Sequence, residues 1–415
     1  MDAEARDQRT RFVAFLRQLA VWGPGLLVML ADMDAGNVVA ASQGGAQWGC
    51  RLLPLLLLLI PVLYIVQELT VRLGVHTGRG HGELIRERFG AGWAWLSLAG
   101  LSAAAIGSLV TEFTAVAGIG ELFGVAREVS LPVAAVALLL IVGTGSYRRV
   151  ERVALAVGLL ELAFFAVVWV AHPDFGSLVS DAADQPVGNA GFAYLAAAII
   201  GATFNPWMIF YQQSATVDKR LQPDDLKSAR WDTGVGAVLT QCLAAAVLVA
   251  AAATLRSGGA PASLDSVGEI SDALTPLLGP QVGQVVFGVG VLGASFVAAI
   301  VASLALTWGV GEVTGRRRSL EYRPFEARWF LGVYAACIIG VAILVGWVPD
   351  LVWLTITAQV ANAFLMPLVI GLLVALVIRV LPESHRPSKA YLCLAVASTA
   401  LVSGLGLIGG LAGLF

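Results

Sequence analysis

The sequence predicts an all-α integral membrane protein with eleven transmembrane helices. Of its 415 residues, 58% are hydrophobic and only 13% are charged, and the mean hydropathy is +0.81. An average soluble domain is far less apolar than this. The formal net charge is −2, so the composition does not suggest nucleic-acid binding.

Eleven apolar stretches are long enough to cross a hydrocarbon core of ~30 Å, which takes about 20 helical residues. They lie at about 20–46, 52–73, 92–124, 129–146, 150–171, 190–216, 232–254, 279–311, 327–348, 350–378 and 388–414. No soluble domain or low-complexity segment interrupts them. We therefore expect a single polytopic transmembrane domain over residues 1–415.

Basic residues are concentrated in alternate loops. The N-terminus and the loops after even-numbered spans hold 23 of the 26 Lys and Arg residues, and the other three are Arg51, Arg127 and Arg256. Because cytoplasmic loops are enriched in Lys and Arg, the N-terminus is predicted to be cytoplasmic and the C-terminus external in a cell inner (cytoplasmic) membrane. A missed helix would scramble this alternation, so the pattern also supports the count.

The remaining sequence features carry little chemistry. The N-terminal stretch 1–18 lacks the apolar core and cleavage site of a removable signal peptide. The external segment 172–189 is acidic, and it either attracts cations or is an ordinary solvated loop. Four cysteines occur singly, without metal-ligand spacing, and are predicted to be packing residues. They are Cys50, Cys242, Cys337 and Cys393.

Span one contains polar and flexible residues at mid-membrane depth, namely Asp32, Asp34, Gly36 and Asn37. A carboxylate at a helix centre costs ~2.5–3.5 kcal/mol on insertion scales, so this run must be buried and compensated. We expect the helix to unwind at Ala35–Gly36 and to direct Asp34 and Asn37 into a shared cavity. A freed carbonyl at Ala31 would join them.

Span six contains Pro206, which lacks a backbone N–H and clashes with the carbonyl of Ala202. We expect a break there, which makes the Ala202 carbonyl and the Asn205 side-chain oxygen candidate ligands. Irregular backbone at membrane depth is tolerated only where protein or a water-filled cavity satisfies it.

Spans one and six are the first members of two consecutive sets of five, which is the plan of an inverted repeat. The predicted repeats cover about 20–171 and 190–378, and an extra helix follows at about 388–414. In transporters of this plan the two broken helices meet near the bilayer midplane and bind ions there.

The candidate metal ligands are therefore all oxygens, from Asp34, Asn37, Asn205, Ala31 and Ala202. Such a set suits a hard divalent cation, because softer metals are usually given Cys, Met or His. The alternative is that Asp34 and Asn37 only hold helices together. Further weaker candidates are Asp32 in span one and the span-ten amides of Gln359 and Asn362.

These motifs resemble the NRAMP family of divalent metal transporters, whose first helix carries Asp-Pro-Gly-Asn and whose sixth carries Met-Pro-His. Here the first motif reads Asp34-Ala35-Gly36-Asn37, and QGGAQWG from Gln43 and RLGVHTG from Arg72 add to the resemblance. It implies a LeuT-like fold of five plus five inverted helices with broken helices 1 and 6, plus an eleventh helix. It also implies that Asp34, Asn37 and the carbonyls of Ala31 and Ala202 bind metal.

The departures from the family pattern indicate a different metal. Asn205 stands where the family has its metal-binding Met, and Trp207 replaces the following His. In span three the family has an Asp and a Glu that serve a proton route, but this chain has Glu112 and Ala115. The pattern resembles the divergent NRAMP-related magnesium transporters, and Mg²⁺ prefers oxygen ligands.

We therefore expect a transporter of Mg²⁺, and also of Mn²⁺, that works by alternating access without proton coupling. The alternatives are a proton-coupled Mn²⁺ or Fe²⁺ symporter and an amino-acid transporter of the same plan. No HExxH, GxSxG or paired catalytic Asp motif indicates an enzyme. The expected partners are the metal substrate and the lipid bilayer, with no cofactor and no obligate protein partner.

Overall fold

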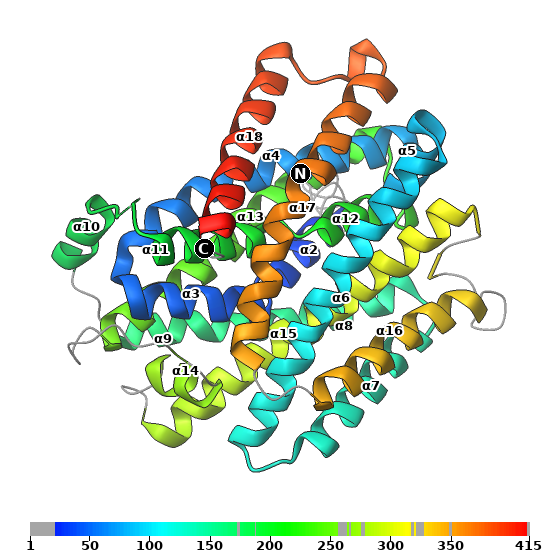
Figure 1. The fold of residues 1–415 in the computed structure, drawn as a ribbon. Coiled ribbons are helices and arrows are strands. Elements are labelled where there is room, and N and C mark those ends of the chain that lie inside the picture. The colour runs from blue at the N-terminus through cyan, green and yellow to red at the C-terminus, as the bar shows by residue number, and fades with distance from the viewer. Residues whose placement is uncertain are drawn as a thin grey trace, which may run out of the picture.

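The computed structural model describes residues 21–171, 175–186, 188–255, 264, 267–274, 279–316, 319–320, 328–347 and 351–412 (Figure 1). Within these ranges every regular element is a helix and no strand occurs. The predicted N-terminal stretch 1–18, Arg256 and most of the segment that links the seventh and eighth spans lie outside the described residues.

The first half of the chain is built mainly from five predicted spans. Two of them are interrupted, because α2 is separated from α3 by two residues and a short 3₁₀ segment, η2 (Leu159–Leu162), separates α8 from α9. The helices are α2 (Pro24–Asp32), α3 (Ala35–Trp48), α4 (Leu53–Thr77), α5 (His81–Phe89), α6 (Ala91–Leu122), α7 (Arg127–Gly143), α8 (Tyr147–Gly158), α9 (Ala163–Ala171) and α10 (Phe175–Ala183).

The second half begins with another interrupted span and continues with five long helices. The 3₁₀ turn η3 (Pro223–Asp225) precedes the first of these long helices. The helices are α11 (Ala190–Thr203), α12 (Pro206–Asp218), α13 (Leu226–Leu255), α14 (Val267–Leu274), α15 (Pro280–Thr314), α16 (Arg328–Trp347), α17 (Leu351–Val380) and α18 (Lys389–Ala412).

Nine stretches of the described residues are long and apolar enough to cross a membrane. The first of them, Ala35–Thr77, contains both α3 and α4, and the 17-residue α7 is just below the length limit of 18. When α2–α3, α4 and α7 are counted as separate crossings, the described residues contain the eleven predicted spans. The short helices α5, α10 and α14 fold in segments that the sequence marks only as loops.

The interrupted pairs α2–α3 and α11–α12 lie inside the bundle and other helices surround them, whereas the α8–α9 span is mostly exposed. The long helices α6 and α15 pack against each other, and α13 contacts α2, α3 and α4. Helices α7 and α16 lie side by side at one edge, far from α18 (Figure 1). Polar backbone at the two interruptions is therefore covered by protein, as a low-dielectric surrounding requires.

Candidate functional site

The first helix break lies at Met33–Asp34, since α2 ends at Asp32 and α3 begins at Ala35. The predicted break at Ala35–Gly36 was wrong by two residues. The physical reason is capping: Asp34 is the N-cap of α3, and its Oδ1 accepts a hydrogen bond of 2.7 Å from the Asn37 backbone N–H. Asp is among the residues most favoured at this position.

Glu112 of α6 contacts the same break. In a continuous helix the Ala35 N–H would donate to the Ala31 carbonyl, but here it donates to Glu112 Oε2 at 3.3 Å. The Asn37 side-chain Nδ2 donates to the Asp32 carbonyl at 2.8 Å. The break thus releases the Ala31 carbonyl from its helical partner, as the sequence predicted, and gives Glu112 a structural contact with the site.

The second break lies at Phe204–Asn205, between α11 and α12. Pro206 is the first residue of α12 and supplies no N–H to the Ala202 carbonyl. That carbonyl instead accepts a hydrogen bond of 2.8 Å from Asn205 Nδ2. The predicted ligands Ala202 and Asn205 are therefore hydrogen-bonded to each other. The Ala202 carbonyl oxygen has a second lone pair that can still bind a metal.

Helix α17 joins the two breaks. Its Asn362 Nδ2 donates to Asn205 Oδ1 at 2.5 Å and to Gln359 Oε1 at 3.2 Å. A Cβ atom added to Gly36 would lie 1.7 Å from Gln359 Nε2, and one added to Gly201 would lie 1.8 Å from the Gln359 carbonyl oxygen. The contact at Gly201 is with backbone, so only glycine there allows α17 to approach α11 this closely, whereas the contact at Gly36 is with a side chain that can move.

Four acceptor oxygens around the first break are buried and have no hydrogen-bond partner among the described residues. They belong to Asp32 (Oδ1), Asp34 (Oδ2), Asn37 (Oδ1) and Glu112 (Oε1). The donor Gln359 Nε2 is also without a partner there. A buried polar group left unsatisfied costs roughly 1–3 kcal/mol, and more when charged. Two of the four, Asp34 Oδ2 and Asn37 Oδ1, belong to predicted ligands, and a buried acceptor without a donor can take up a cation.

The predicted ligands are closed off from solvent in this conformation. Asp34 and Asn37 are 0% exposed, and Asn205 is 2% exposed. Asp32, a weaker candidate, packs toward α13, where Thr240 Oγ1 lies 3.5 Å from its Oδ2. An ion can reach or leave these oxygens only if helices move.

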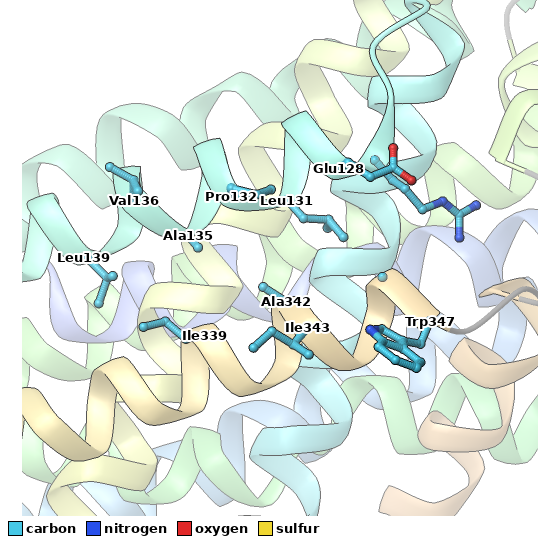
Figure 2. Close-up of a pocket in the computed structure, with 12 residues that line it drawn as sticks. Glu128, Leu131, Pro132, Ala135, Val136, Leu139, Ile339, Ala342, Ile343 and Trp347 are labelled. Carbon is cyan, nitrogen blue, oxygen red and sulfur yellow. The ribbon is translucent and has the colours of Figure 1, made fainter.

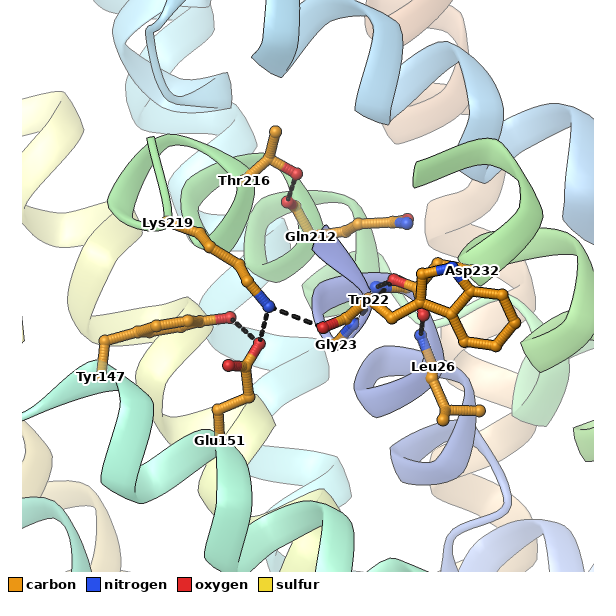
Figure 3. Close-up of polar contacts among 10 residues, drawn as sticks. Trp22, Gly23, Leu26, Tyr147, Glu151, Gln212, Thr216, Lys219 and Asp232 are labelled. Atoms are coloured by element: carbon orange, nitrogen blue, oxygen red, sulfur yellow. Dashed lines mark hydrogen bonds and ion pairs between the residues drawn. The ribbon is translucent and has the colours of Figure 1, made fainter. Parts of the chain in front are cut away.

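A polar network fixes the start of α2 to three other helices (Figure 3). Asp232 of α13 accepts hydrogen bonds from the backbone N–H groups of Gly23, Gly25 and Leu26, at 2.7–3.1 Å. Lys219, next to the end of α12, donates to the Trp22 carbonyl at 2.7 Å and to Glu151 of α8 at 2.8 Å. Movement of α2 at this end must break these bonds.

The sequence did not predict this network, because its members are ordinary loop and helix-end residues far apart in the chain. Gln359 and Asn362 were predicted only as weaker candidates, and the structure places both beside the breaks. The sequence feature that indicated Gln359 and Asn362 was a pair of amide side chains, three residues apart, within an apolar span.

The chain matches the family model described as natural resistance-associated macrophage protein-like (Nramp) over residues 25–411. It is 29% identical over 308 residues to a "Divalent metal cation transporter MntH" of Brucella suis, covering 70% of this chain and 66% of that protein. A protein of the same description from Deinococcus radiodurans is 30% identical over 304 residues, covering 70% and 68%. The chain thus spans slightly less than two thirds of the Brucella relative.

Solved structures share the fold. A manganese transporter of Eremococcus coleocola superposes with a TM-score of 0.76 at 17% identity, covering 95% of this chain and 86% of that one. MhsT, solved with L-phenylalanine, superposes with a TM-score of 0.57 at 15% identity, covering 94% and 98%. The fold is the LeuT-like one that the resemblance implied, and the match over residues 25–411 shows that the chain belongs to the Nramp family.

Proposed function

We propose that this chain transports divalent cations, foremost Mg²⁺ and also Mn²⁺, across a membrane, and that it is not an enzyme. The observation that supports this most is that Asp34 Oδ2 and Asn37 Oδ1, two oxygens of the proposed ligands, are buried without a hydrogen-bond partner among the described residues. When it is ionised, a buried carboxylate such as that of Asp34 is stabilised by a cation more than by a neutral ligand.

The proposed ligands are Asp34, Asn37, Asn205 and the backbone carbonyls of Ala31 and Ala202. All are oxygen donors, which suits Mg²⁺ and Mn²⁺. Asn205 is held by Asn362, so its amide oxygen has a fixed position from which to reach a metal or a metal-bound water. Mg²⁺ usually keeps several waters, so a partly hydrated ion fits a set with few charges.

Transport would proceed by alternating access. The proposed repeats, about 20–171 and 190–378, each begin with an interrupted helix, and the site between them is buried. Opposite ends of the first interrupted helix are fixed separately: α2 by the Lys219–Asp232 network, and α3 by Gln43, whose Nε2 donates to the Leu264 carbonyl at 2.5 Å. If the contacts at only one end of this helix were broken, the site would open to only one side of the membrane.

The second candidate is a proton-coupled Mn²⁺ or Fe²⁺ symporter. The relatives named divalent metal cation transporters and the Eremococcus manganese transporter support its metal, Mn²⁺. The residues favour Mg²⁺ without coupling, because Asn205 offers no thioether and because Ala115 and Trp207 cannot exchange protons.

The transport proposal is tested with the purified protein in liposomes that contain a Mg²⁺-sensitive dye. External Mg²⁺ should enter faster than into protein-free liposomes, and external Mn²⁺ should compete with it. Failure of Mg²⁺ to enter, together with uptake of a radiolabelled amino acid, would show that the chain transports an organic substrate and not a metal.

We also propose an inner-membrane orientation with a cytoplasmic N-terminus and an external C-terminus. Contacts agree with two separate ends of the bundle: Lys219 meets Glu151 on one predicted side, and Arg51 meets Asp184 on the other, at 2.7 Å. In a background without the four native cysteines, Glu128→Cys should react with a membrane-impermeant maleimide on intact cells. Lys227→Cys should react only after permeabilisation, and the reverse pattern would overturn the orientation.

A further inference from the structure

A groove of about 890 Å³ lies on the outside of the bundle between α4 and α13, with Phe165 of α9 at its side. We call it the α4–α13 groove. Its volume lies in the range of ligand sites, ~300–1,000 Å³. Along α13 its lining runs from Lys227 to Cys242, about 22 Å at 1.5 Å per residue. That length covers the headgroup layer and one leaflet of a ~30 Å hydrocarbon core.

The two ends of the groove differ in chemistry. At the start of α13 its lining includes Lys227, which is exposed, and Arg230. Farther along, the lining is apolar, with Val235 and Val238 respectively 40% and 49% exposed. A charged head followed by an apolar slot matches the shape and polarity of a phospholipid.

Both charged side chains that line the groove are basic. Arg230 pairs with Glu68 at 2.7 Å, but Glu68 also pairs with Arg72 at 2.7 Å, so one carboxylate is shared between two guanidinium groups. Asp224 and Asp225 precede α13 and do not line the groove, and Asp225 is bonded to the Gln222 backbone N–H. The mouth of the groove therefore keeps excess positive charge.

The lining of the groove also includes a glycine, Gly234, and two aromatic side chains, Tyr64 and Trp231. A Cβ atom at Gly234 would lie 3.4 Å from Cε2 of Tyr64, so this glycine leaves space above the tyrosine ring. Trp231 is 63% exposed beside Arg230. Trp and Tyr are enriched at headgroup level, so this end of the groove lies where a lipid phosphate would be.

A second outer groove provides a contrast. It lies between α7 and α16, has a volume of about 440 Å³ and is lined mostly by apolar residues such as Leu139 and Ile343 (Figure 2). Its charged lining residues are Arg127 and Glu128, which have opposite signs. It therefore offers acyl chains a surface without selecting an anionic headgroup.

We propose that the α4–α13 groove binds an anionic phospholipid, with the phosphate at Lys227 and Arg230 and an acyl chain along Val235 and Val238. Basic pockets between transmembrane helices bind anionic headgroups, and each basic residue near the membrane surface contributes about fivefold in affinity. The proposed orientation puts this groove in the cytoplasmic leaflet, although the binding chemistry does not depend on it.

Native mass spectrometry of the full-length protein would measure binding of phosphatidylglycerol and of phosphatidylcholine with the same acyl chains. Phosphatidylglycerol should bind several-fold more tightly. Lys227→Gln should weaken it about fivefold, and Lys227→Gln combined with Arg230→Gln should remove the preference. Gly234→Leu, which fills the slot, should weaken binding of both lipids at this site.

Arg88→Gln is the matched control, because Arg88 is an exposed basic residue in the last turn of α5, a helix that packs on α6 and α15 and does not line the groove. It should retain the full preference for phosphatidylglycerol. Equal affinities for the two lipids in the unmodified protein would overturn the proposal, since they indicate a non-selective lipid layer. The same conclusion would follow if Lys227→Gln and Arg88→Gln had equal effects.

Discussion

Asp34→Ala should reduce Mg²⁺ uptake by more than about 100-fold, beyond the 10–100-fold losses seen when only outer partners of a metal site are removed. The substitution removes a proposed charged ligand whose Oδ2 is buried without a partner among the described residues. It also removes the cap of α3, which contributes only about 1 kcal/mol. Uptake into dye-loaded liposomes measures the loss, and the thermal unfolding midpoint reports whether the fold is retained.

A second substitution of Asp34 distinguishes the role of its negative charge from its role as the N-cap of α3, and a substitution of Ser42 is the control. Asp34→Asn keeps an oxygen that can accept from the Asn37 N–H but removes the negative charge, so it should lose most uptake while unfolding near the temperature of the unmodified protein. Ser42→Ala, at a buried position on the same half-helix, should retain uptake. Normal uptake by Asp34→Ala would exclude Asp34 as a ligand.

Asn205→Met should shift the ratio of Mn²⁺ to Mg²⁺ uptake toward Mn²⁺ by about tenfold, because a thioether suits the softer ion and 1.4 kcal/mol of differential binding is sufficient. The amide oxygen that Asn362 now holds at 2.5 Å would be lost. Parallel uptake measurements with the two metals give this ratio directly. Asn205→Ala should have a milder effect on Mg²⁺, since a water can replace one amide oxygen.

Asn205→Leu is the control for size. Leucine resembles methionine in volume but has neither the oxygen nor the sulfur, so it should weaken Mg²⁺ uptake without favouring Mn²⁺. An equal shift in both variants would mean that shape, and not the sulfur atom, sets the metal preference. An unchanged ratio in Asn205→Met would remove Asn205 from the proposed ligand set.

The two helix breaks were predictable because they have local causes. Pro206 cannot donate to Ala202, and Asp34 is a strong N-cap, although the sequence interpretation placed the first break two residues too late. The apolar stretches predicted the number of spans, and the alternation of basic residues supported that number. These signals depend on backbone chemistry and on charge within short segments.

The role of α17 was not predictable in the same way. Gln359 and Asn362 reach the breaks because Gly201 allows close packing of α11 and α17, two helices that are distant in sequence. The 3₁₀ segment η2 also had no local signal. It carries Glu161, which is buried and has no hydrogen-bond partner among the described residues.

Coupling follows from the groups that surround the ion. Glu112 remains beside the first break, where it accepts from the Ala35 N–H, but Ala115 and Trp207 occupy the other positions at which the family has titratable groups. A membrane potential supplies ~2.3 kcal/mol per elementary charge per 100 mV, so a divalent ion gains about twice that without protons. Under the proposed uncoupled mechanism, voltage alone would be sufficient to drive uptake.

The most direct test of this account is simultaneous measurement of internal Mg²⁺ and internal pH in proteoliposomes with an imposed inside-negative potential. We expect Mg²⁺ entry that increases with voltage while the internal pH stays constant. Acidification that accompanies Mg²⁺ at a fixed stoichiometry, and that disappears in Glu112→Gln or Glu161→Gln, would contradict the account and show that metal movement is coupled to protons.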